Sequence, residues 1–197
     1  MNQEQINQNT INYFKAVQQY VEKLGDVKAT VGVHSDKGEN VKKAIWNEFG
    51  THHILKYDSI PVENQGLLPL SSATYQSLSY ENVIANKSAD ISIPARPFVR
   101  LYLYPASVLK IEREFQKNFD TMIRFHKRLN NSMHAASSTL DNVGRVAKEE
   151  MKNKIKNGNT YKPNSAITKM IKGFDHPLYN TGEMLNAIDN KVERRGA

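Results

Sequence analysis

The segment that most constrains this chain is residues 93–100, which read I-P-A-R-P-F-V-R. Each of its two prolines fixes its own φ angle and pushes the preceding residue toward an extended conformation. The segment is therefore predicted to be stiff and extended, which suits a docking edge better than an enzyme loop that must move. We expect it to deliver Phe98 to the core, and Arg96 and Arg100 to the surface or to a neighbouring subunit.

Composition bounds the kind of protein. A chain of 197 residues, 39% of them hydrophobic, suits a single domain over residues 1–197. It contains no apolar run long enough for a transmembrane helix, and its first residues lack the basic and apolar regions of a signal peptide. It has no cysteine, which excludes disulfides and thiolate metal sites. We expect a protein that is assembled in the cytosol and has no membrane partner.

Hydrophobic periodicity predicts helices over residues 5–24, 41–49, 105–129, 138–157 and 165–171, and a half-buried strand over residues 26–34. The predicted buried face of the first helix consists of Ile6, Ile11, Phe14, Val17 and Val21. Residues 91–104 are expected to be extended as far as Pro105, which suits a first helical turn.

Near the end of the chain, Thr181 predicts a further helix start, because its hydroxyl can accept an N–H group of the first turn. Only residues 191–197 are left beyond that helix, so we expect the last strand to be short or frayed.

Two more stretches stand out beside residues 93–100. Residues 44–51 read A-I-W-N-E-F-G-T, and residues 172–184 read K-G-F-D-H-P-L-Y-N-T-G-E-M. In this order the three stretches resemble the neck and tail-completion proteins of long-tailed bacteriophages, whose series is A-x-x-N-E-F-G-T, I-P-A-R-P-F-x-R and K-G-x-x-x-P-L-x-x-T-G-x-(L/M). Relatives of that family include the virion-morphogenesis proteins of Mu-like phages. The resemblance spans about residues 31–188.

The chain departs from that pattern between the first two motifs. The family has a short gap there, whereas this chain has about forty residues, 52–91, rich in Ser, Asn and Tyr. We expect these residues to form an inserted loop or hairpin arm that touches a neighbouring subunit. The expected fold is α+β: a small, mostly antiparallel sheet packed with helices, plus the inserted arm.

The motif residues have physical roles as well. Trp46 and Phe49 are expected to anchor helix 41–49 on the sheet, and Gly50 to allow a sharp exit from it. Gly173 and Gly182 are expected to permit tight turns on either side of Pro177. The planar donors of Arg96 suit a carboxylate of the same chain or of the next subunit, and Glu48 is expected to pair with Arg96 or to accept N–H groups of its turn. The interface candidates are Arg96, Pro97, Phe98, Arg100, Glu48 and Tyr80.

A search for catalytic patterns points away from an enzyme. The chain has no G-x-S-x-G elbow, no phosphate loop, no dinucleotide fingerprint and no pair of histidines at metal-binding helical spacing. We therefore expect no catalytic residue, no metal and no cofactor. A hydrolase with an unfamiliar site is the weakest alternative.

The resemblance implies a structural virion protein at the head–tail junction. Copies of the chain would form a ring that joins the tail tube to the head connector, with packaged DNA in the channel as a further contact. A head-completion or minor head protein is the nearest alternative. A basic nucleic-acid-binding accessory protein is another, because the net charge is +7 and residues 145–197 hold 11 Lys or Arg against 6 Asp or Glu. A solvated helix face would explain that charge equally well.

Overall fold

The computed structural model describes residues 3–56, 88–125, 129, 131–164, 169 and 173–196. The fold is α+β, as predicted, and its strands pair as antiparallel ladders. The described residues divide into two compact units. The first unit lies within Met1–Lys37, Phe98–Lys154 and Leu185–Ala197, and the second within Gly38–Pro97 and Ile155–Met184. The single domain over residues 1–197 stays a prediction.

The first unit begins with helix α1 (Gln3–Gly25) and strand β1 (Val27–Val33), close to the predicted bounds. The predicted buried face of α1 is wrong for most of its length. Ile6, Ile11, Phe14 and Val21 are 45–64% exposed, whereas Tyr20 is fully buried. Ile6, Ile11 and Phe14 lie before Ala16, where the core first meets α1, and Val21 lies on a side of the helix that the core leaves exposed.

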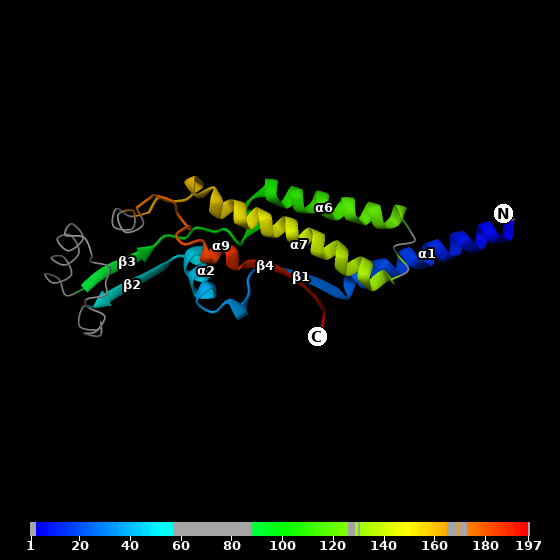
Figure 1. The fold of residues 1–197 in the computed structure, drawn as a ribbon, viewed down its shortest axis with the longest axis horizontal. Helices are drawn as coiled ribbons and strands as arrows, with labels where there is room; N and C mark the ends of the chain where they lie inside the picture. The colour runs from blue at the N-terminus through cyan, green and yellow to red at the C-terminus, as the bar shows by residue number, and fades with distance from the viewer. Residues whose placement is uncertain are drawn as a thin grey trace. The chain divides into compact units, whose positions relative to one another are not determined.

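Strand β4 (Ile188–Arg194) corrects the prediction of a short or frayed last strand. It pairs antiparallel with the whole of β1, from Val27 opposite Arg194 to Val33 opposite Ile188 (Figure 1). The preceding helix α9 (Glu183–Ala187) has only five residues. The chain therefore leaves the helix early enough to build a full seven-residue strand.

Two long helices complete the first unit and lie side by side (Figure 1). Helix α6 (Pro105–Arg124) starts at Pro105 as predicted, after a short 3₁₀ turn, η4 (Leu101–Leu103), where an extended chain was expected. It ends five residues before the predicted end at residue 129, and α7 (Ser132–Lys156) begins six residues before its predicted start at residue 138. The core contains Tyr20, Val27, Met122, Leu129, Ala135 and Ala136.

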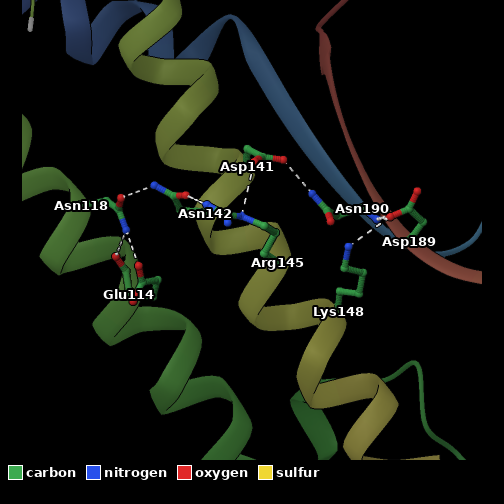
Figure 2. Close-up of polar contacts among 8 residues, drawn as sticks. All are labelled: Glu114, Asn118, Asp141, Asn142, Arg145, Lys148, Asp189 and Asn190. Atoms are coloured by element: carbon green, nitrogen blue, oxygen red, sulfur yellow. Dashed lines mark hydrogen bonds and ion pairs between the residues drawn. The ribbon is translucent and has the colours of Figure 1, made fainter. Parts of the chain in front are cut away.

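Polar side chains connect α6, α7 and β4 within this unit (Figure 2). Asn142 of α7 donates to Asn118 of α6 at 2.6 Å, and Asn118 donates in turn to the Glu114 carboxylate at 2.7 Å. On the other side of α7, Asn190 of β4 donates to Asp141 at 2.8 Å. Figure 2 also shows Lys148 of α7, which pairs with Asp189 of β4 at 3.2 Å, and Arg145, which contacts both Asp141 and Asn142.

Gly144 explains how β4 can come so close to α7. A Cβ atom at this position would lie 3.2 Å from Asn190 Cβ, tighter than ordinary packing allows. The missing side chain therefore provides the room for the Asn190 amide to reach Asp141.

The second unit holds a short 11-residue helix, α2 (Glu39–Phe49), followed at once by strand β2 (Thr51–Lys56). Strand β2 pairs antiparallel with β3 (Ser88–Ile93), from Thr51 opposite Ile93 to Lys56 opposite Ser88. The two ends of the predicted insertion thus lie side by side as a ladder, while residues 57–87 lie outside the described part. The predicted helix over residues 165–171 also lies almost wholly outside it.

The anchoring role predicted for Trp46 and Phe49 is not supported. Trp46 is 42% exposed and Phe49 is 65% exposed, while Ala44 and Glu48 are buried. Helix α2 therefore turns Ala44 and Glu48 inward instead of its two aromatic residues.

Candidate functional site

The three stretches that stand out in the sequence meet within the second unit. The backbone N–H of Arg96 donates to the carbonyl of Asn47 at 2.7 Å. This bond joins residues 93–100, the proline segment, to the end of α2. Lys43 of α2 pairs with Glu183 of the third stretch at 2.9 Å. Residues as far apart in the sequence as Lys43 and Glu183 thus lie close together. Their spacing in the sequence does not predict this proximity.

Gly50 makes the first of these junctions possible. Its φ angle is +75°, and a Cβ atom there would lie 2.8 Å from both the Ala95 nitrogen and the Ile93 oxygen. Only glycine satisfies this backbone conformation and this close approach without strain. The sharp exit predicted at Gly50 is therefore confirmed, and its physical reason is contact with the proline segment.

Arg96 corrects the prediction that its side chain reaches the surface. It is only 6% exposed, and its guanidinium donates to the carbonyls of Lys162 and Pro163 at 3.1 and 3.3 Å and, at 3.5 Å, to the side-chain oxygen of Asn164. Within the described residues it forms no pair with Glu48. Burial lowers the Arg96 pKa, and the nearby charge of Asp175 opposes that effect.

Further polar contacts hold the loop residues around Asn164, whose carbonyl and amide oxygens Arg96 contacts. Asp175 accepts the backbone N–H of Asn164 at 3.1 Å and pairs with Lys169 at 2.7 Å. The Lys169 hydrogen bond is the main reason why the Asp175 pKa is lowered. The Tyr161 hydroxyl donates to the carbonyl of Pro97 at 3.0 Å, which ties the loop a second time to the proline segment.

His176, the residue after Asp175, contacts two backbone carbonyl groups through its ring nitrogens. One ring nitrogen lies 2.9 Å from the carbonyl oxygen of Lys156, and the other lies 2.9 Å from that of Pro177. Its ring also lies against Gly158, where a Cβ atom would come within 2.9 Å of it. His176 therefore joins the end of α7 to the turn at Pro177.

A pocket of about 720 Å³ lies where these segments meet. Its lining residues come from α2, the proline segment, the loop over residues 162–164 and residues 178–184. Among the described residues, the charged side chains that line it are the cations Lys43, Arg96 and Lys162 and the carboxylate Glu183. Ile93, Pro94 and Leu178 supply apolar surface.

The interface candidates divide by burial. Phe98 is fully buried, which confirms its place in a core, and Glu48 is 4% exposed. Neither these two nor Arg96 can touch another subunit in this conformation. Pro97 and Arg100 are half-buried and stay candidates, and Tyr80 lies outside the described residues.

The predicted turn residues are placed as follows. Gly173 and Gly182 both have positive φ angles, 74° and 84°, which confirms their use in turns, and Pro177 is buried. Thr181 accepts the N–H of Glu183 at 3.5 Å, so the predicted cap is present but long. Asn164 and Lys162 were missed, because a K-P-N sequence predicts a loop and says nothing about what the loop lines.

Comparison with known proteins does not extend this description. No family model, no curated protein and no solved structure matches the chain. In the part of the chain that the structure describes, no group of three or more His, Cys, Asp or Glu side chains could hold a metal ion. No helix within the same residues is both long and apolar enough to cross a membrane.

Proposed function

We propose that this chain is a structural virion protein of a tailed phage, a neck or tail-completion protein whose copies form a ring between the tail tube and the head connector. The observation that carries the proposal is the convergence of the three ordered motifs in the second unit. The Asn47–Arg96 backbone bond and the Gly50 contact join the first motif to the second, and the Lys43–Glu183 pair joins helix α2, which carries most of the first motif, to the third. Motif residues used in this way maintain a shape, which is what an assembly protein requires.

Helix α1 of the first unit supports assembly with further copies. Ile6, Phe14 and Val21 lie within one broad face of the helix and are 45%, 64% and 49% exposed. Exposed apolar residues gathered on one face are typical of protein–protein contacts. We assign this face to the contact between copies in the ring.

The nucleic-acid-binding alternative is less well supported. In the basic region over residues 145–197, Arg145, Lys148, Lys169 and Lys191 each pair with an aspartate of the chain. Charges that are already paired offer less to a phosphate backbone, whose binding depends on free Lys and Arg side chains.

Electron microscopy of particles from a phage that lacks this gene tests the proposal. We expect DNA-filled heads beside separate tails. Heads that have lost their DNA beside normal tails would instead indicate the head-completion alternative. Normally joined virions would refute the structural role, and a steeply salt-dependent affinity of the purified protein for DNA would then favour the accessory-protein alternative.

Complementation of that phage tests the ring contact. Phe14→Ser removes an apolar side chain from the exposed face of α1, whereas Gln19→Ser, on the opposite face, serves as the matched control. Both variants should keep the thermal stability of the monomer, because both side chains are exposed. We expect only Phe14→Ser to reduce the yield of joined virions, and equal yields from the two variants would contradict the assignment of α1.

A further inference from the structure

The pocket of the second unit contains a buried positive charge that is bonded to no carboxylate of the described residues. Among the residues that the structure describes, the acceptors of the Arg96 guanidinium are neutral: two backbone carbonyls and the Asn164 amide oxygen. The carboxylate of Asp175 is occupied by Lys169 and by the Asn164 N–H, and it acts on Arg96 only through space. Burying a cation is costly unless an anion accompanies it.

The side-chain nitrogen of Asn164 is a further hydrogen-bond donor in this pocket, and it has no acceptor among the described residues. The Asn164 side chain lines the pocket and is only 8% exposed. A buried donor left without a partner costs about 1–3 kcal/mol. The Asn164 side chain contributes to the lowered pKa of Asp175, as the last of its causes, but no acceptor of the described residues forms a hydrogen bond with the amide nitrogen, and the same side chain contacts the Arg96 guanidinium.

The remaining charges of the pocket are also positive in balance. Lys43 and Glu183 neutralise each other through their 2.9 Å pair. Lys162, a further lining residue, forms no ion pair within the described residues. Arg96 and Lys162 thus give the described lining of the pocket an excess of positive charge.

We propose that this pocket binds a carboxylate group, with the Arg96 guanidinium and the Asn164 amide as its donors and Lys162 as a nearby charge. The guanidinium keeps donors to spare, because its Nη1 has no partner among the described residues and a carboxylate accepts more than one hydrogen bond. A volume of about 720 Å³ also leaves room for the body of the ligand against Ile93 and Leu178. The carboxylate belongs either to a free small molecule or to an acidic side chain of a protein segment. This inference does not depend on the proposed phage function.

Nuclear magnetic resonance of the full ¹⁵N-labelled chain reads the site directly. The side-chain N–H signals of Arg96 and Asn164 are followed while one of two probes is added: succinate, or a blocked pentapeptide with a central glutamate. The matching controls are chloride at equal ionic strength and the same peptide with glutamine in place of glutamate. We expect at least one carboxylate probe to shift both side-chain signals in a saturable way, and neither control to do so.

The two probes separate the two sources. Saturation by succinate alone assigns the pocket to a free carboxylate, and tighter binding of the glutamate peptide assigns it to a protein segment. Shifts that chloride reproduces, or no saturable shift with either probe, would overturn the proposal.

Variants tie the effect to the pocket. Asn164→Asp places a carboxylate of the chain itself where the Asn164 oxygen lies 3.5 Å from Arg96, so it should weaken probe binding by at least about tenfold. Lys162→Met should weaken it by a smaller factor without disturbing the buried groups. Lys42→Met, which removes an exposed positive charge of α2 that does not line the pocket, should leave it unchanged. Equal affinities in all three variants would refute the site even if a probe binds.

Discussion

The hydrogen bond between Tyr20 and Thr139 tests how helix α1 is held in the first unit. The two hydroxyl oxygens lie 2.8 Å apart and join residues 119 positions apart in the sequence, and both residues are fully buried. Tyr20→Phe keeps the aromatic ring but leaves the Thr139 hydroxyl without this partner. A buried hydroxyl that loses its partner costs about 1–3 kcal/mol. The lower value applies if Thr139 turns to a carbonyl of the preceding helical turn, as a helical threonine can.

A double-mutant cycle isolates this hydrogen bond from the rest of the core. Thr139→Val removes the other hydroxyl with little change of shape, and the double variant removes both. The double variant should lose clearly less stability than the sum of the two single variants, with a coupling of about 1 kcal/mol. In thermal unfolding followed by circular dichroism, each kcal/mol corresponds to a shift of about 2–4 °C for a chain of this length. Strictly additive losses, or no loss for Tyr20→Phe, would refute the structural role of this bond.

The same residue gives a prediction for alkaline pH. Burial raises the Tyr20 pKa above its ordinary value of 10.0, against the opposing effect of the Thr139 hydrogen bond. The unfolded chain therefore loses this proton first, so the stability that Tyr20 contributes is intact below its ordinary pKa and is lost as the pH rises toward the raised value. The difference in stability between the native chain and Tyr20→Phe should shrink in that range, and a constant difference would contradict it.

Three further perturbations test other parts of the structure. Glu150→Gln replaces a buried carboxylate that accepts from Ser107 and Lys110 at 2.7 Å each, and it should cost about 1.5–3 kcal/mol at neutral pH. Burial raises the Glu150 pKa, but the hydrogen bonds from Lys110 and Ser107 and the nearby lysine charges outweigh burial, so the pKa is lowered overall. The difference in stability between the native chain and Glu150→Gln should therefore vanish in acid unfolding curves as the pH falls through the lowered pKa. Gly50→Ala should destabilise the second unit by more than about 1 kcal/mol in denaturation followed by the fluorescence of the one tryptophan, whereas Gly25→Ala, which meets nothing within 4 Å, should be nearly neutral. Phe98→Ala should cost about 3–5 kcal/mol in calorimetry, because the side chain is fully buried; a loss under 1 kcal/mol would mean that Phe98 is not a core residue.

Local chemistry allowed much of the fold to be predicted. The start of α6 at Pro105 and the turn at Gly50 depend on backbone dihedral limits that belong to single residues. The bounds of α1 and β1 also follow from periodicity along the chain. Such features can be predicted because their cause lies within a few residues of where they occur.

Burial on α1 could not be predicted in the same way. Periodicity identifies an apolar face but not the length over which a partner covers it, and here the core covers α1 only from Ala16 onward. Strand β4 was underestimated because the length of the preceding helix α9 is set by where the chain must rejoin β1. Both outcomes depend on segments far away in the sequence: α6 and α7 for the core beside α1, and β1 for the strand β4.

Arg96 and Asn164 show the same division at the candidate site. The sequence by itself determined that residues 93–100 are stiff and that Phe98 goes inward, because two prolines restrict the backbone whatever surrounds them. Only the tertiary structure decided that Arg96 is buried against the carbonyls of residues 162 and 163 and that the Asn164 amide nitrogen is left without a partner. A long side chain takes the acceptors that folding brings within reach, and those acceptors come from a loop that no local rule connects to the proline segment.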